Sequence, residues 1–111
     1  MFNFREMSTE ELTPQQAEQK LKGGQTLLID VRESYEFSQI HIDGAKLVPL
    51  GDLPRRIKEV ASPEQELIVM CRSGSRSSYA LQQLKSMGYK KVYNLNGGII
   101  SWAMSGLPVL R

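Results

Sequence analysis

IVMCRSGSRS, residues 68–77, is the stretch that decides the fold of this 111-residue chain. A short apolar run ends in Cys71, which is the only cysteine of the protein. A loop rich in glycine, serine and arginine follows, and the next apolar residues, Ala80, Leu81, Leu84 and Met87, stand at helical spacing. The pattern predicts a buried strand that leads into a helix, with the thiol at the junction.

The rest of the chain repeats this alternation of strand and helix. We predict further strands at residues 4–7, 26–31, 45–49 and 89–95, the first of them a short edge strand. Helices are expected at residues 14–22, 34–40, 52–60 and 77–87, and around Ile100 and Trp102. The run at 26–31 is continuously apolar before Asp30, which is typical of a parallel strand covered on both faces. The order predicts an α/β domain with helices on both faces of a mostly parallel sheet.

Capping signals mark several helix starts. The segments STEE, residues 8–11, and TPQQ, residues 13–16, have the spacing of a capping box, and the second places Pro14 at the first helical position. Asp52 is expected to cap the helix that follows it.

Composition limits the class of protein. The length is typical of one domain, so we expect a single domain over residues 1–111 with its core at about 4–110. A net charge of +2 does not favour nucleic-acid binding through general basicity. We find no signal peptide and no run near the roughly 20 apolar residues that span a membrane, which favours a soluble, cytoplasmic protein. One cysteine and one histidine, His41, argue against a disulfide or a metal site, and a free thiol persists in a reducing compartment.

The surroundings of Cys71 favour a reactive thiolate. Thiolate is stabilised by helix N-termini, by neighbouring cations and by oriented backbone N–H groups. The predicted helix supplies the first, Arg72 and Arg76 the second, and Gly74, which tolerates a positive φ, lets successive N–H groups turn inward. Cys71 also follows a strand of an open α/β sheet, where ligands bind beyond the carboxyl ends of the strands.

Structural roles compete with functional ones at several residues. A lone cysteine at a strand end is often a small buried hydrophobe, although arginines, serines and glycine are a poor core sequence. His41 is expected to bond in the turn at residues 43–44 rather than to form a Cys/His site. The pair Gly97-Gly98 fits a tight turn better than a phosphate loop, since GxGxxG is absent. Tyr35, Phe37 and Trp102 are interpreted as packing residues.

Five segments together resemble the single-domain rhodaneses, which are thiosulfate-type sulfurtransferases. They are LIDVRE at 28–33, YEF at 35–37, HIDGA at 41–45, CRSGSRS at 71–77, and LNGGI at 95–99 with Trp102. The resemblance covers about residues 4–110 and follows the order and spacing of the family. Asp43 replaces the usual proline and Ile40 a common glycine, both away from the thiol.

The resemblance implies a small doubly wound sheet of about five strands and a persulfide formed on Cys71. Sulfane sulfur would come from thiosulfate or a persulfide donor and pass to cyanide, a thiol or a protein, without metal or organic cofactor. The loop residues Arg72, Ser73, Gly74, Ser75 and Arg76 would bind the anionic donor through their N–H groups, with the two arginine side chains as further candidates. Arg32 either reaches the same mouth or pairs with Glu33 or Glu36, and Asp30 is expected to bond loop backbone.

Other functions are compatible with parts of the pattern. A cysteine phosphatase or arsenate reductase of related fold is one alternative. Cysteine phosphatases resemble one another in having five residues between the cysteine and an arginine, whereas four separate Cys71 from Arg76 here. The shorter loop favours a sulfur atom over a phosphoryl group. A rhodanese-like module that only binds partners usually lacks the cysteine. A carrier that moves sulfur between proteins fits the same residues as the enzyme.

Overall fold

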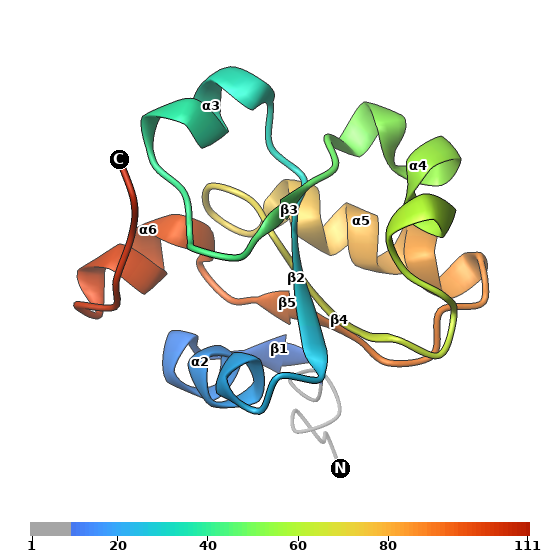
Figure 1. Cartoon of the computed structure of the whole chain (residues 1–111), viewed down its shortest axis with the longest axis horizontal. Coiled ribbons are helices and arrows are strands. Elements are labelled where there is room, and N and C mark those ends of the chain that lie inside the picture. The colour runs from blue at the N-terminus through green and yellow to red at the C-terminus, as the bar shows by residue number, and fades with distance from the viewer. Residues whose placement is uncertain (1–9) are drawn as a thin grey trace, which may run out of the picture.

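The computed structural model of the protein describes residues 10–111. Its elements run β1 Glu11–Leu12, α2 Pro14–Lys22, β2 Thr26–Asp30, α3 Ser34–Gln39, β3 Lys46–Leu47, η1 Leu50–Asp52, α4 Leu53–Val60, β4 Glu66–Met70, α5 Ser75–Ser86, β5 Val92–Leu95 and α6 Gly98–Met104 (Figure 1). The five strands form one sheet in the order β1-β5-β4-β2-β3. Every pair of neighbouring strands in it is parallel. The predicted α/β fold, with a small doubly wound sheet of five strands, is confirmed.

Alternate residues of the central strand β4 build the two halves of the core. Leu67 and Val69 pack with α4 and α5 on one face, while Ile68 and Met70 pack with α2 and α6 on the other. Figure 1 shows these two pairs of helices on opposite sides of the sheet. All four side chains are fully buried, which explains why the strand is a continuous apolar run.

The N-terminal edge of the sheet differs from the prediction. The edge strand predicted at 4–7 and the first half of the STEE capping box lie outside the described residues. Glu11, predicted in the first turn of a helix, belongs instead to β1, which pairs with β5. The N–H groups of Asn94 and Asn96 donate to the carbonyls of Glu10 and Leu12, at 2.7 and 2.9 Å. These carbonyls are therefore held by the sheet and are not available to a helix.

The second capping box is confirmed at α2. The Thr13 hydroxyl accepts from the N–H of Gln16 at 3.1 Å, and the Gln16 side chain accepts from the N–H of Thr13 at 2.9 Å. The prediction for Asp52 is wrong. A 3-10 turn leads into α4, so Asp52 already has helical torsions, with φ −99° and ψ −7°, and its carboxylate accepts from Arg55 instead of capping.

The remaining boundaries follow the prediction with shorter strands. Residues 89–91 leave α5 as a loop, and only Val92–Leu95 pairs as β5. Tyr89 is held there because its buried hydroxyl donates to the carbonyl of Ala61 at 2.6 Å. Among the helices of residues 10–111, none is both long and apolar enough to cross a membrane.

His41 has a structural role, although not in the predicted turn. Its Nδ1 lies 3.0 Å from the carbonyl oxygen of Phe37 in α3, and its ring stacks on the Phe37 ring with centroids 4.1 Å apart. Its backbone pairs with that of Leu110 through two hydrogen bonds. His41 therefore joins the end of α3 to the C-terminal segment.

Candidate active site

Parallel strands bring several polar segments to one edge of the sheet. β4 ends at Met70 and delivers Cys71, while its neighbours β2 and β5 end at Asp30 and Leu95. The segments that follow these three strands therefore meet at the carboxyl edge, which is the usual ligand edge of an open α/β sheet.

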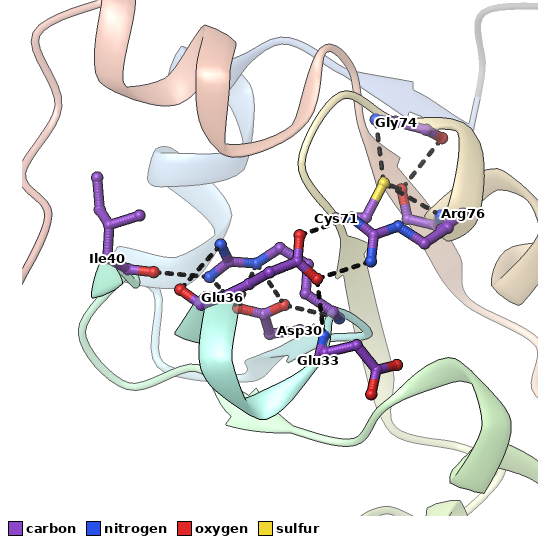
Figure 2. A network of polar contacts seen from close by, with 9 residues as sticks. Asp30, Glu33, Glu36, Ile40, Cys71, Gly74 and Arg76 are labelled. Atoms are coloured by element: carbon purple, nitrogen blue, oxygen red, sulfur yellow. Dashed lines mark hydrogen bonds and ion pairs between the residues drawn. The ribbon is translucent and has the colours of Figure 1, made fainter. Parts of the chain in front are cut away.

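The loop after Cys71 curls around the sulfur. Gly74 has a φ of +114°, a conformation that a residue with a Cβ rarely adopts, and it directs its N–H at Sγ from 3.1 Å (Figure 2). The N–H and the hydroxyl of Ser77, in the first turn of α5, each lie 3.4 Å from Sγ. Helix α5 begins at Ser75, so its positive N-terminal end faces the thiol. Cys71 itself is 1% exposed.

These donors determine the acidity of the thiol. Burial raises the pKa of Cys71, since a buried thiolate loses hydration. The Ser77 hydroxyl, which can turn toward the thiolate, and the N–H groups of Ser77, Gly74 and Ser73 lower it by more. The pKa of Cys71 therefore lies below its ordinary value of 9.0. A buried cysteine of the core alone would have its pKa raised, so the loop distinguishes this residue from a structural one.

The Gly97-Gly98 turn supports the loop from behind. The N–H of Ile99 donates to the carbonyl of Cys71 at 3.0 Å, and that of Ile100 donates to the carbonyl of Arg72 at 3.2 Å. Gly98 has a φ of +62° and lies against these two carbonyls. The glycine pair thus forms the predicted tight turn. The N–H groups at the N-terminus of α6 are hydrogen-bonded to backbone carbonyls of the active loop.

Arg32 forms a buried ion pair with a partner that was not predicted. Its guanidinium donates to both carboxylate oxygens of Asp30, with Nε 3.0 Å from Oδ1 and Nη2 2.8 Å from Oδ2, and also to the carbonyl of Ile40 at 2.7 Å. Of the two alternatives for Arg32, the ion pair with the carboxylate of Glu33 or Glu36 is wrong, since the guanidinium pairs with Asp30. Asp30 does bond loop backbone, since it accepts from the N–H of Arg32 at 3.0 Å. Arg32 is 2% exposed, and the pair fixes the turn from β2 into α3.

Arg76 is bound to α3. Its two Nη atoms donate to the two carboxylate oxygens of Glu36 at 2.8 and 2.9 Å, a bidentate pair that connects the active loop with α3 (Figure 2). The hydrogen bond from Arg76 lowers the pKa of Glu36 from 4.5 to about 2, and the same contact raises the pKa of Arg76. The Arg76 guanidinium is therefore hydrogen-bonded to Glu36 and not to Cys71.

This ion pair predicts an acid-dependent loss of stability. The pKa of Glu36 is lower in the folded than in the unfolded protein, so its contribution is complete above about pH 4.5 and disappears as the pH falls toward 2. We expect urea unfolding to show wild type more stable than Glu36→Gln by a constant amount near neutral pH and by a shrinking amount below pH 4.5. Glu59→Gln, at an exposed site of α4, should match wild type throughout. A difference in stability between wild type and Glu36→Gln that does not change with pH would contradict a stabilising ion pair between Glu36 and Arg76.

Arg72 lines a cavity of about 330 Å³ beside the loop. The cavity lies between α3, the active loop and α6, and its lining includes Arg32, Glu36, Ile40, Arg72, Ile100 and Met104. The Arg72 side chain is exposed and forms no ion pair with another described residue. Ser73 and Ser75 are also exposed, and the N–H of Ser73 is among the groups that lower the pKa of Cys71.

Three residues around Cys71 were not predicted as site residues. Ser77 and Asn94 are buried and joined by a hydrogen bond of 2.6 Å, and Glu36 holds Arg76. Asn94 has a visible signal, since it is a polar residue at an inward position of an apolar strand. Within residues 10–111 no group of three metal-ligating side chains gathers at this site or elsewhere.

Comparison with known proteins agrees with this geometry. The family model described as "Rhodanese-like domain" matches residues 13–105. A sulfurtransferase of Allochromatium vinosum is 40% identical over 84 residues, which are 76% of this chain and 78% of that protein. Thiosulfate sulfurtransferase 18 of Arabidopsis thaliana is 33% identical over 107 residues, covering 85% of this chain and 78% of that protein.

Solved structures give the same result. A rhodanese-related protein from Thermoplasma volcanium superposes with a TM-score of 0.80 at 26% identity, covering 91% of this chain and 97% of the other. Some relatives are longer, and of three of them the chain spans only 55%, 51% and 25%. The family match over most of the chain is nevertheless direct: this chain belongs to the rhodanese-like domain family.

Proposed function

We propose that the protein is a sulfurtransferase that carries sulfane sulfur on Cys71, acting as one domain in a reducing, cytoplasmic environment where its thiol stays free. The observation that carries the proposal is the set of N–H groups from Gly74 and Ser77 that converge on Sγ at the carboxyl edge of the sheet. They stabilise the Cys71 thiolate, which is present before the donor is attacked and again after the persulfide is discharged.

The reaction requires only two displacements at sulfur. The Cys71 thiolate attacks the outer sulfur of thiosulfate, the sulfur–sulfur bond breaks, and sulfite leaves with the bonding pair. An acceptor such as cyanide or a thiol then attacks the outer sulfur of the persulfide and returns Cys71 to the thiolate. Because the chain holds one cysteine, no second thiol of its own can resolve the persulfide, and the sulfur leaves to an external acceptor.

Substrate binding is proposed for the active loop and the cavity beside it. Backbone N–H groups of residues 72–76 would hold the reacting sulfur, while the exposed Arg72 side chain attracts the anionic end of the donor. Arg32 lines the same cavity and adds a guanidinium whose Nη1 makes only a long contact, 3.4 Å, to the carbonyl of Glu36. Arg76 contributes positive charge near Cys71 while it stays bound to Glu36.

Arg72→Ala tests the binding role. We expect the KM for thiosulfate to rise about tenfold with little change in kcat, because a charge-assisted contact of this size contributes roughly 1.5 kcal/mol. Steady-state thiocyanate formation measures both constants. Arg55→Ala removes another exposed arginine, in α4, and should leave both constants unchanged. A KM for Arg72→Ala equal to that of wild type would assign donor binding to the backbone alone.

Two other activities make distinct predictions. A protein-to-protein sulfur carrier would form the same persulfide but discharge slowly to cyanide or small thiols. A cysteine phosphatase would hydrolyse phosphate esters, although the four residues between Cys71 and Arg76 leave a cradle suited to a sulfur atom.

The deciding experiment supplies the protein with thiosulfate and cyanide, then with a glutathione persulfide and a thiol, and separately with p-nitrophenyl phosphate. We expect sulfur transfer with at least one donor and no phosphate release. Phosphate release without sulfur transfer would replace the proposed function by a phosphatase.

A further inference from the structure

A chain of hydrogen-bonding groups runs from Cys71 through the buried Ser77 and Asn94 to Glu11 in the edge strand β1. The Ser77 hydroxyl lies 3.4 Å from Sγ and 2.6 Å from Oδ1 of Asn94. Nδ2 of Asn94 lies 3.1 Å from a carboxylate oxygen of Glu11 in β1 and 3.3 Å from the carbonyl of Gly74. Ser77 and Asn94 are both buried, so water does not compete for these groups.

The chemistry of the partners fixes the direction of every bond in this chain. A carboxylate and a carbonyl only accept, so the side of Asn94 that faces Glu11 and Gly74 must be its NH₂ group. Its Oδ1 therefore faces Ser77 and can only accept. At 2.6 Å the hydroxyl of Ser77 must donate its single hydrogen to Asn94, and that hydrogen is not directed at Cys71.

We propose that Asn94 is a positioning residue that holds the Ser77 hydroxyl hydrogen away from the Cys71 sulfur, so that the thiolate gains this hydrogen bond only by giving up the one to Asn94. Glu11 keeps Asn94 in the orientation that does this. The inference rests on the proposed role of Cys71 as the nucleophile.

The arrangement has a function at the discharge step. When an acceptor attacks the outer sulfur of the persulfide, the sulfur–sulfur bond breaks and its electron pair stays on Sγ. The Ser77 hydroxyl can then rotate from Asn94 to the departing thiolate, since a bond to an anion is stronger than one to a neutral amide. The donor therefore stays on Asn94 while Sγ is neutral, as in the thiol and the persulfide, and turns to Sγ when it becomes a thiolate.

Removing Asn94 should therefore make the thiol more acidic. In Asn94→Ala the hydroxyl no longer loses a buried partner when it turns to the thiolate, and the Gly74 carbonyl, at 3.2 Å, remains its only other acceptor. We expect the pKa of Cys71 to fall by about one unit. If Asn94 served only to fill space, its removal would loosen the packing and would raise the pKa of Cys71 or leave it unchanged.

The charges around Cys71 stay the same in this variant. They are Arg72 in the loop, Arg76 in α5, Glu36 in α3, the Asp30–Arg32 pair after β2, and Glu11 behind Asn94; α6 carries no titratable side chain. A change in the pKa of Cys71 therefore reports the hydrogen bond and not a change of field.

The experiment is a double-mutant cycle read by the pH dependence of iodoacetamide alkylation. Wild type, Asn94→Ala, Ser77→Ala and the double variant are compared, with Asn96→Ala as the exposed control of the same residue type. We expect the pKa of Cys71 to fall in Asn94→Ala and to be unchanged in Asn96→Ala. The pKa of Cys71 should be the same in Ser77→Ala and in the double variant. A fall that persists without Ser77, or no fall at all, would overturn the proposal.

A second cycle covers the case in which Asn94→Ala does not fold. Glu11→Gln, at the partly exposed edge strand, lets the Asn94 amide turn over because glutamine can donate as well as accept. Part of its effect on the pKa comes from the lost charge and persists in the Ser77→Ala background. We expect Glu11→Gln to lower the pKa of Cys71 more when Ser77 is present than in the Ser77→Ala background. An equal effect in both backgrounds would also overturn the proposal. Alkylation needs no sulfur donor, so these results are separate from a failure to transfer sulfur.

Discussion

Cys71→Ser is expected to reduce sulfur transfer by more than about 10³-fold, the scale on which enzymes respond to loss of a nucleophile. A serine hydroxyl cannot accept sulfane sulfur as a stable persulfide, and no other cysteine is present to replace the thiol. The backbone donors of Gly74 and Ser77 remain in place, so the fold should be retained. Thiocyanate formation from thiosulfate and cyanide measures the loss.

Two controls make the result specific. Urea unfolding should show nearly equal stability for wild type and Cys71→Ser, which separates loss of the nucleophile from loss of structure. Ser78→Ala, at an exposed position of α5 near the loop, should keep full activity. Appreciable transfer by Cys71→Ser would show that sulfur does not pass through this residue.

Gly98→Ala is expected to destabilise the protein by about 3 kcal/mol and to inactivate it. A methyl group at Gly98 would lie 2.5 Å from the carbonyl oxygen of Cys71 and closer still to that of Arg72. Both are backbone atoms and cannot move without displacing the active loop. The positive φ of +62° adds a strain of roughly 1 kcal/mol for any residue with a Cβ.

Gly106→Ala separates the two causes. Gly106 also has a positive φ, +80°, but nothing lies within 4 Å of a methyl group there. This variant should lose only about 1 kcal/mol in urea unfolding and keep its activity. Equal effects of the two substitutions would mean that Gly98 does not support the loop by close contact.

The architecture was predictable because its signals are local. β2 and β4 are continuous apolar runs that can only be satisfied by helices on both faces, and Thr13 carries a complete capping box. The active loop was predictable for the same reason, since strand, thiol, glycine and helix follow each other without interruption. β1 was not, because a strand of two residues is defined by its pairing with β5 and not by its own composition.

The parts of the site that were not predicted depend on contacts between distant segments. Asn94 lies 17 residues from Ser77, and Glu36 lies 40 residues from Arg76, so neither contact has a sequence spacing that reveals it. Arg32 shows the same limit at short range. The buried Arg32 pairs with the buried Asp30, two residues away across the turn. The nearby Glu33 is exposed and Glu36 is partly exposed, and their closeness in sequence did not reveal this difference.

The most direct test of a sulfur relay is the intact mass of the protein after incubation with thiosulfate or a glutathione persulfide. We predict a gain of about 32 Da, one sulfur atom, that cyanide or a thiol removes and that Cys71→Ser does not acquire. An unchanged mass with both donors, under conditions where iodoacetamide alkylates Cys71, would contradict the account.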